Sequence, residues 1–339
     1  MPKKIKIKFQ NGISKDGACR GILNELANDY IFEECDDPDF ILFGPYGNDT
    51  PKPGNYTRIG YYCENVQPDL SICEWAFGMS SEEEVNDNRY RKIQWHDLDP
   101  SAFIKPDDYD AEKIFEQKKN FCAFVYRHEV LYREEFFKQL SRYKKVDAPG
   151  RSMNNMQNDI DTKYKGSVWE RKRQFLQSYK FTIAFENYIY PGYQTEKLYD
   201  AMLADSIPIY CGDVYVDKIF NTASFINAPG YINFNNSATV NFLQKYAQPD
   251  FNDIRPAHYS KPADSIKRKL KSIGREQKIK LQLKNFDFSA VIDKVMELDQ
   301  DKDKYIQTLK QPWLNNNEVP LGASLKSRWI EIFEQPIIK

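Results

Sequence analysis

The sequence KFTIAFENYIYPGYQTEKLYDAMLADSIPIYCG, residues Lys180–Gly212, reads as a strand, a loop, a helix and a second strand. Phe181–Phe185 alternates and is mostly apolar, as a buried strand would be, and a loop with proline and glycine follows at Glu186–Gly192. Thr195 is a residue type that caps helices, and the apolar residues after it recur at helical spacing. Ile207–Tyr210 then predicts another short strand.

Charged residues gather where this predicted helix begins, namely Glu186, Glu196 and Lys197. A helix N-terminus presents unpaired N–H groups and a partial positive charge, so it binds phosphate well. A nucleotide site at this junction between strand and helix is the first hypothesis.

Composition limits the classes of protein to which the chain can belong. Its 339 residues favour two lobes over one, and its 48 basic and 49 acidic side chains nearly cancel. A near-zero net charge argues against binding nucleic acid through a general positive field, so any anion site must be local. Aromatic residues, at 14%, suit ring-lined sugar or base sites as well as an ordinary core.

The cysteines and histidines argue against a structural zinc site. The six cysteines form no Cys-x-x-Cys pair, and the chain has three histidines. The first residues, MPKKIKIKFQ, lack the apolar region of a signal peptide, and no run of about 18 apolar residues occurs. We therefore expect reduced thiols, no transmembrane segment and a cytoplasmic protein.

Two segments near the C-terminus bear on membrane contact and packing. The basic run Lys267–Lys280 leaves peripheral contact with the anionic surface of an inner membrane open. Gly274 interrupts this run and its apolar face is thin, which favours a solvated helix face instead. The last segment, with Trp329 and Phe333, predicts an amphipathic helix that packs back on the protein.

Strand and helix signals alternate along the first part of the chain. Strands are expected at Lys4–Phe9, Asp39–Phe43 and Tyr56–Tyr62, with a helix at Gly21–Tyr30. The stretch Lys105–Lys119 then turns polar and charged, and we place a boundary between lobes there.

The same alternation resumes after that boundary. Further elements are expected as a strand from Phe121 to Tyr126, a helix at Leu131–Tyr143, a strand at Lys145–Val146, a helix at Val168–Tyr179 and a strand at Ser224–Ile226. Alternating strands and helices predict a mostly parallel sheet with helices on both faces. Ligands bind such sheets outside the carboxyl ends of the strands, where Glu186 follows its strand.

The segment Lys180–Gly212 carries an ordered set of motifs. These are Phe185-Glu186-Asn187, then Tyr193-Gln194-Thr195-Glu196-Lys197-Leu198, then Pro208-Ile209-Tyr210-Cys211-Gly212. The set closely resembles the signature of glycosyltransferase family 10, the α1,3-fucosyltransferases. Gln194 stands where the family usually has valine, and Cys211 stands where bacterial members often have tryptophan.

Two other segments extend the resemblance, which reaches from about Asp39 to Asn227. Phe124–Arg151 is similar to the family's strand, arginine-bearing helix and Tyr-Lys-Lys-Val-Asp strand, although Tyr126-Arg127 replaces the usual Ser-Asn. Arg133 falls at the position of the family's phosphate-binding arginine. Ile59–Met79 resembles the stretch that contains the family's catalytic glutamate, which would be Glu64.

The resemblance implies an α/β, GT-B-like fold with two Rossmann-type lobes and a cleft between them. We assign residues 1–117 to an acceptor lobe, 118–310 to a donor lobe and 311–339 to a tail helix. The resemblance also implies GDP-fucose as the donor substrate, inverting transfer, and no metal or other cofactor.

An inverting transfer also makes its own demands on the residues of the site. Inversion takes a single displacement, so one base must lie on the acceptor's side; Glu64, at a strand exit, is the candidate, with a solvated loop charge as the alternative. A leaving diphosphate without a metal needs fixed cations, and Arg133 and Lys197 fit. Surface ion pairs with Glu134 and Glu196 are the alternative for these two.

The remaining motif residues are assigned to the donor. We expect Glu196 to accept hydrogen bonds from the ribose hydroxyls, and Asn187 and Tyr193 to contact the diphosphate or the sugar. Glu186 is expected to steady the fucose or the loop, and Thr195 to cap the helix.

A metal-dependent transferase would instead bridge phosphate through Mg²⁺ or Mn²⁺ with an Asp-x-Asp pair. Several such strings occur in charged, turn-like surroundings, and we interpret them as solvated. They are Asp37-Pro38-Asp39, Asp97-Leu98-Asp99, Asp108-Tyr109-Asp110, Asp159-Ile160-Asp161 and the segment Asp299–Asp303.

The leading hypothesis is an inverting α1,3-fucosyltransferase that moves L-fucose from GDP-fucose to the GlcNAc of a Galβ1,4GlcNAc-type glycan, giving a Lewis x-type product. N-acetyllactosamine is the simplest such acceptor. The alternatives are a GT-B transferase with another nucleotide sugar or linkage, and a non-catalytic protein that binds nucleotide or glycan.

Overall fold

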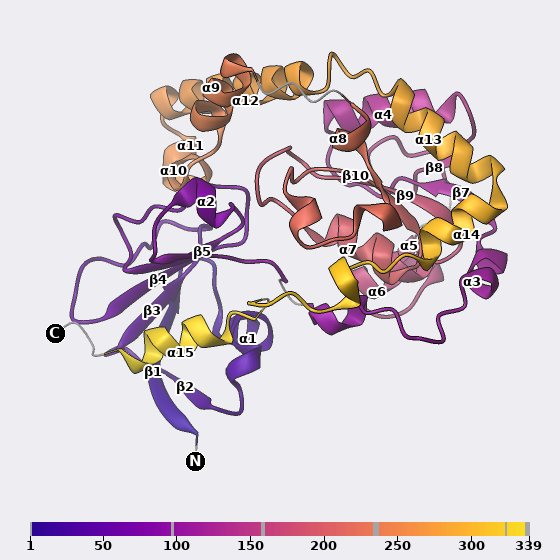
Figure 1. The fold of residues 1–339 in the computed structure, drawn as a ribbon. Helices are drawn as coiled ribbons and strands as arrows, with labels where there is room; N and C mark the ends of the chain where they lie inside the picture. Colours follow the sequence, from indigo (N-terminus) through magenta and orange to yellow (C-terminus); the bar gives the residue numbers. More distant parts are fainter. Residues whose placement is uncertain (1, 96–97, 157–159, 233–236, 323, 336–339) are drawn as a thin grey trace. The chain divides into compact units, whose positions relative to one another are not determined.

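The computed structural model describes residues 2–95, 98–156, 160–232, 237–322 and 324–335. The chain divides into two compact units, each assembled from segments that are far apart in the sequence. Unit 1 comprises Met1–Asp99, Leu243–Arg275 and Leu321–Lys339, and unit 2 comprises Pro100–Phe242 and Glu276–Pro320. Each unit contains a parallel sheet (Figure 1).

The sheet of unit 1 has the strand order β2-β1-β3-β4-β5-β6. Its strands are β1 (Lys3–Gln10), β2 (Tyr30–Glu34), β3 (Phe40–Phe43), β4 (Thr57–Tyr62), β5 (Trp75–Gly78) and β6 (Tyr90–Lys92). All neighbouring pairs are parallel, so the carboxyl ends of β3 and β4 meet at one edge. The strands expected at 4–9, 39–43 and 56–62 are confirmed.

The helix expected at Gly21–Tyr30 is wrong. Short α, π and 3₁₀ turns occupy residues 15–26, and β2 begins at Tyr30. Leu23 and Leu26 are both buried, and residues three apart share a face in a 3₁₀ turn, so these turns bury them without a full α-helix.

Helices cover both faces of the unit 1 sheet. Its helices are α1 (Lys15–Gly17), α2 (Glu82–Val85), α10 (Phe251–Ile254), α11 (Pro256–Tyr259) and α15 (Lys326–Glu334). Trp329 of α15 stacks on Phe77, with ring centroids 4.3 Å apart. On the opposite face, Phe251 of α10 packs edge-on against Tyr62 at 5.5 Å. Two helices from the second half of the chain thus cover the two faces of a sheet that is formed by the first hundred residues.

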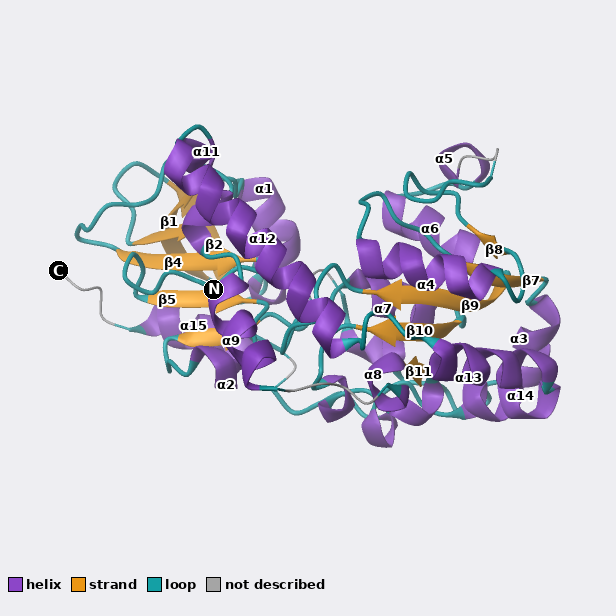
Figure 2. Cartoon of the chain, turned by 90° about the horizontal axis from the view of Figure 1, so that it is seen from above, coloured by secondary structure: helices purple, strands orange, loops and turns teal. Residues whose placement is uncertain are grey.

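The sheet of unit 2 has the order β11-β10-β9-β7-β8, and Figure 2 shows its strands side by side. The strands are β7 (Asn120–Ala123), β8 (Val146–Asp147), β9 (Tyr179–Phe185), β10 (Ile207–Cys211) and β11 (Ile226–Asn227). All pairs are parallel, and β9 is central. The predicted strand, loop, helix and strand of residues 180–212 are confirmed as β9, α7 and β10.

Helices pack on both faces of this sheet, as expected. The helices of unit 2 are α3 (Ala111–Gln117), α4 (Leu131–Ser141), α5 (Ile160–Lys163), α6 (Val168–Leu176), α7 (Glu196–Leu203), α8 (Ala228–Tyr231), α13 (Ser289–Gln300) and α14 (Lys302–Lys310). Figure 1 shows α6 and α7 on one face, with α4 and α13 on the other. Phe136 of α4 and Phe288 before α13 both pack on Phe185, with centroids 4.7 and 5.9 Å away.

The units differ from the division expected at residues 117 and 118. Residues 100–117 belong to unit 2 because α3 packs on α14, with Phe115 and Tyr305 in edge contact at 5.3 Å. The Lys105 ammonium group adds a hydrogen bond to the Gln311 carbonyl at 2.6 Å. Residues 243–275, expected in the donor lobe, belong to unit 1 through contacts such as that of Phe251.

Two of the four boundaries between the units fall inside α9 (Ala238–Ala247) and α12 (Pro262–Gln282). The sequence suggested that Gly274 interrupts the basic helix, but α12 runs through this residue without a break. A Cβ at Gly274 would lie 2.8 Å from Cβ of Ala247, so the missing side chain lets α12 approach α9 closely. Among the described helices, none is long and apolar enough to cross a bilayer.

Candidate active site

The end of β9 is tied to the start of α7 by a buried carboxylate, Glu186. Its side chain is completely buried, and its two oxygens accept the Thr195 N–H at 2.8 Å and the Thr195 hydroxyl at 2.7 Å. Thr195 occupies the N-cap position, as predicted, but its hydroxyl bonds to Glu186 rather than to a helix N–H. The strand end, the loop and the helix start therefore form one connected unit.

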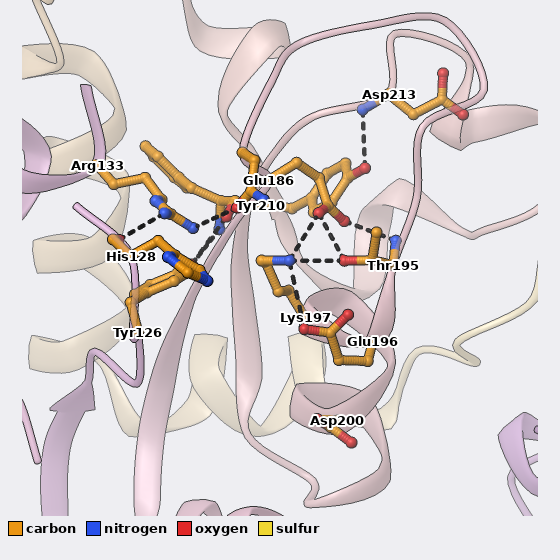
Figure 3. Close-up of polar contacts among 12 residues, drawn as sticks. Tyr126, His128, Arg133, Glu186, Thr195, Glu196, Lys197, Asp200, Tyr210 and Asp213 are labelled. Carbon is orange, nitrogen blue, oxygen red and sulfur yellow. Dashed lines mark hydrogen bonds and ion pairs between the residues drawn. The ribbon is translucent and has the colours of Figure 1, made fainter. Parts of the chain in front are cut away.

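Lys197, in the first turn of α7, points back toward this carboxylate (Figure 3). Its ammonium nitrogen lies 2.9 Å from the Thr195 hydroxyl, 3.3 Å from Glu186 and 3.4 Å from Glu196. Burial would lower the pKa of Lys197, but the two carboxylates outweigh burial and raise it. Lys197 is therefore a fixed positive charge at the helix N-terminus.

The two carboxylates beside Lys197 differ in environment. Complete burial raises the pKa of Glu186 above its ordinary value, with Lys197 opposing the shift. Burial acts in the same direction on Glu196, but Lys197 and Lys172 outweigh it and lower the pKa of Glu196. The Glu196 side chain is 35% exposed, so its carboxylate can accept hydrogen bonds from a ligand.

Arg133 forms a second fixed cation at the same end of β9. It lies in the first turn of α4, is 1% exposed, and donates to the Asn187 side-chain oxygen at 3.0 Å and to the His128 carbonyl at 2.9 Å. Its guanidinium carbon lies 4.1 Å above the Tyr126 ring, a cation–π contact. The buried Nε of Arg133 has no hydrogen-bond partner among the described residues.

The loop between Glu186 and Thr195 is braced from two other segments. Asp213, which follows β10, accepts the Gly192 N–H at 2.7 Å and the Gln194 side-chain amide at 2.6 Å. Gly192 has φ of +85°, a conformation that favours glycine. Lys278 of α12 donates to the Ile189 carbonyl at 2.7 Å. The loop that carries Tyr193, which is buried, is thus held in one conformation.

Gly212 has a steric reason to be glycine. A Cβ there would lie 2.5 Å from Glu186 Cγ and 2.5 Å from the Tyr210 hydroxyl. That hydroxyl accepts the Asp213 N–H at 2.8 Å, and the Tyr132 hydroxyl donates to the Glu186 carbonyl. The absence of a side chain at Gly212 therefore lets the end of β10 pass beside the buried carboxylate.

The structure brings the predicted donor-site residues together at the carboxyl end of β9. They are Arg133, Glu186, Asn187, Thr195, Glu196 and Lys197, while Tyr193 is buried in the loop that precedes α7. Arg133 and Lys197 are close enough that Arg133 lowers the pKa of Lys197, although the carboxylates dominate. The sequence did not single out Tyr126 or Asp213 as supports of this site. For Asp213, the signal available in the sequence was an aspartate directly after the motif that ends at Gly212.

Glu64, the predicted base, lies in unit 1, two residues after β4. Its side chain is partly exposed and accepts a hydrogen bond from the Tyr46 hydroxyl. Asn65, the next residue, is buried, and its side-chain oxygen accepts the Gln248 amide at 3.1 Å. Glu64 therefore projects from a backbone segment that is anchored inside unit 1.

The Asp-x-Asp strings do not gather into a metal site among the described residues, where no cluster of three His, Cys, Asp or Glu side chains could hold an ion. Asp97 and Asp159 lie outside the described residues. The solvated interpretation is wrong for Asp299, whose side chain is 4% exposed and pairs with Lys180 at 2.8 Å and Lys144 at 3.0 Å.

Comparisons with known proteins connect both units to one family. The model of the glycosyltransferase family 10 (fucosyltransferase) C-terminal domain matches residues 114–250. The model of the alpha-(1,3)-fucosyltransferase FucT N-terminal domain matches residues 7–96. The first match contains the donor-site residues, and the second contains Glu64.

Individual relatives agree with these matches. A putative fucosyltransferase of Acanthamoeba polyphaga mimivirus is 37% identical over 143 residues, which is 40% of this chain and 21% of the relative. Alpha-(1,3)-fucosyltransferase FucT of Helicobacter pylori is 27% identical over 244 residues, 62% of this chain and 48% of the relative. The aligned stretches thus span half or less of these relatives.

Solved structures show the same fold. A crystal structure of α1,3-fucosyltransferase with GDP-fucose matches 100% of this chain and 93% of its own with a TM-score of 0.63 at 19% identity. A structure of α1,3-fucosyltransferase with GDP gives a TM-score of 0.62 at 20% identity over 99% and 92% of the two chains. The fold is α/β and GT-B-like, with two Rossmann-type lobes. The chain belongs to glycosyltransferase family 10, the fucosyltransferase family.

Proposed function

We propose that this protein is an inverting α1,3-fucosyltransferase that transfers L-fucose from GDP-fucose to the GlcNAc of a Galβ1,4GlcNAc-type acceptor. The observation that carries the proposal is the pair of fixed cations, Arg133 and Lys197, at the carboxyl end of β9. Parallel α/β sheets bind nucleotides at this edge, and both residues lie in the segment that matches the fucosyltransferase family.

The two cations suit a diphosphate that gains charge as it leaves. Arg133 forms no ion pair with a carboxylate among the described residues, and the guanidinium group can hold two phosphate oxygens at once. Lys197 adds a point charge beside the unpaired N–H groups at the start of α7. Glu196 precedes Lys197 and is partly exposed, so its carboxylate would accept hydrogen bonds from the ribose hydroxyls.

The transfer is one displacement at the anomeric carbon. The acceptor oxygen forms a bond to fucose C1 while the bond from C1 to the β-phosphate oxygen breaks, and GDP leaves with that electron pair. The Glu64 carboxylate takes the proton of the attacking hydroxyl. Arg133 and Lys197 supply the positive charge that a metal ion would otherwise supply, so activity should be unchanged by EDTA.

The direct test is incubation with GDP-fucose and N-acetyllactosamine, followed by mass spectrometry and linkage analysis. A product with one added deoxyhexose on O3 of GlcNAc is expected. If no acceptor in a panel gains fucose while another nucleotide sugar is used, the donor assignment is rejected. If GDP binds and no donor and acceptor react, the protein is a binding module rather than an enzyme.

Glu64→Gln tests the base. Turnover should fall by roughly two to four orders of magnitude because the amide cannot accept the proton. Binding of GDP, measured by titration calorimetry, should be unchanged because the donor residues belong to unit 2. Glu84→Gln, at an exposed helix position of unit 1, is the matched control and should be fully active. A Glu64→Gln variant with normal turnover would remove Glu64 from the mechanism.

A further inference from the structure

The proposed base has a hydroxyl partner from a neighbouring strand. β3 and β4 are adjacent and parallel, so the residues that follow them meet at one edge of the unit 1 sheet. Tyr46 lies three residues after β3, and Glu64 two residues after β4. The Tyr46 hydroxyl donates a hydrogen bond to Oε1 of Glu64, and Tyr46 is half exposed.

The position of Tyr46 is fixed by an interlocked pair of loops. The Asn11 side chain donates to the Gly44 carbonyl at 2.6 Å. Gly12 has φ of +94°, and a Cβ there would lie 2.8 Å from Cβ of Tyr46. A Cβ at Gly47 would lie 2.5 Å from the Asn11 side-chain oxygen. Close approach at these two glycines thus holds the tyrosine beside the carboxylate.

The hydroxyl acts only as a donor in this pair. Burial raises the pKa of Tyr46 far above its ordinary value, and the hydrogen bond and charge of Glu64 raise it further. Near these loops, Asp49 accepts the Gln10 amide at 3.3 Å, and Arg255 donates to Thr50 at 3.2 Å.

We propose that Tyr46 is a positioning residue for the catalytic base, an inference that rests on the proposed function. By holding Oε1 of Glu64, the Tyr46 hydroxyl orients the carboxylate so that Oε2 accepts the proton of the acceptor hydroxyl. Tyr46 keeps its own proton throughout.

Tyr46→Phe removes the hydroxyl and keeps the ring. The kcat should fall about tenfold to hundredfold, because the carboxylate loses its orientation. KM for GDP-fucose should not change, because the donor residues belong to unit 2. A positioning role thus lowers kcat alone, whereas general damage to unit 1 would also lower the unfolding temperature.

Tyr56→Phe is the matched control, since the Tyr56 hydroxyl also donates within unit 1, to the Lys52 carbonyl at 2.7 Å. It should leave kcat and KM unchanged. Tyr46→Leu, which removes the ring as well, should lower kcat about as much as Tyr46→Phe does. A loss of kcat in Tyr46→Leu alone would overturn the inference, because the ring and not the hydroxyl would then be responsible.

The result can be separated from a failure of the proposed function. If Glu64→Gln is inactive and Tyr46→Phe has wild-type kcat, only the role of Tyr46 is rejected. If Glu64→Gln is fully active, the base assignment fails and the inference about Tyr46 fails with it. Thermal unfolding of both Tyr46 variants should match that of the wild-type protein within a few degrees.

Discussion

Glu186, a residue of the family motif, is completely buried and acts by holding other residues of the site in place. Both of its oxygens accept hydrogen bonds from Thr195, and Lys197 lies 3.3 Å away. The geometry supports the expected role of steadying the loop. Contact with fucose stays a prediction, because the side chain is completely buried. Its contribution to donor binding would act through the placement of Lys197.

Site residues that are close together along the chain could be predicted from the sequence. The residues of other elements that hold them in place could not. Glu186, Thr195 and Lys197 lie within one motif, so their proximity follows from a single loop and helix start. The contact of Tyr126 with Arg133 and that of Asp213 with Gln194 join separate elements. Such contacts depend on the packing of strands and helices, which local spacing does not encode.

A buried lysine makes stability depend on pH. Burial lowers the pKa of Lys105 to about 7, against an ordinary 10.5. Between these values the unfolded chain binds more protons than the folded protein, so the free energy of unfolding should rise with pH. Urea unfolding from pH 7 to 9 should show a gain of about 1–3 kcal/mol for wild type relative to Lys105→Met.

The comparison with Lys105→Met also cancels the contribution of Lys118, another buried lysine whose pKa is lowered to about 8. Lys138→Met, at an exposed position of α4, is the control and should parallel wild type at every pH. Equal slopes for wild type and Lys105→Met would show that Lys105 does not titrate in this range.

At the scale of elements, the junction of β9, α7 and β10 depends on one missing side chain. Gly212→Ala should destabilise the fold by about 1–3 kcal/mol, because the new Cβ would overlap Glu186 and Tyr210. Displacement of Glu186 should also weaken GDP binding through Thr195 and Lys197. Urea unfolding and titration calorimetry with GDP measure the two effects.

Gly230→Ala, in α8, is the matched control because a Cβ at Gly230 would have no atom within 4 Å. It should be as stable as wild type or slightly more so, and should bind GDP equally well. If Gly212→Ala behaves like this control, the packing around Glu186 is looser than the structure indicates.

The predicted elements of unit 2 were confirmed because each carries a strong local signal. β9 is a mostly apolar segment that ends at a loop, and α7 begins after a capping residue type. The error at Gly21–Tyr30 arose where Leu23 and Leu26 are three apart, a spacing shared by α and 3₁₀ turns. Local pattern alone could not separate the two.

At the scale of the whole molecule, unit 1 relies on residues from the end of the chain. Trp329 is 1% exposed and stacks on Phe77, so Trp329→Ala should cost about 3–5 kcal/mol of stability. Thermal unfolding should therefore begin at a lower temperature. GDP binding at moderate temperature should persist, because the donor residues belong to unit 2.

Trp169→Ala is the control for that prediction, since Trp169 is 50% exposed and belongs to unit 2. It should leave the unfolding temperature nearly unchanged. A Trp329→Ala variant as stable as this control would show that α15 contributes little to unit 1. The division into these units was not predicted, because segments such as 243–275 return to a sheet formed much earlier in the chain.

The dependence of unit 1 on α15 also has a consequence during synthesis. The ribosome completes all six strands of the unit 1 sheet by Lys92, whereas α15 begins at Lys326. At typical translation rates of about 5–20 residues per second, the apolar face of that sheet stays exposed for roughly ten seconds or more before α15 is synthesised. The nascent chain should therefore engage chaperones through Phe40 and Phe77, the residues that α15 later shields.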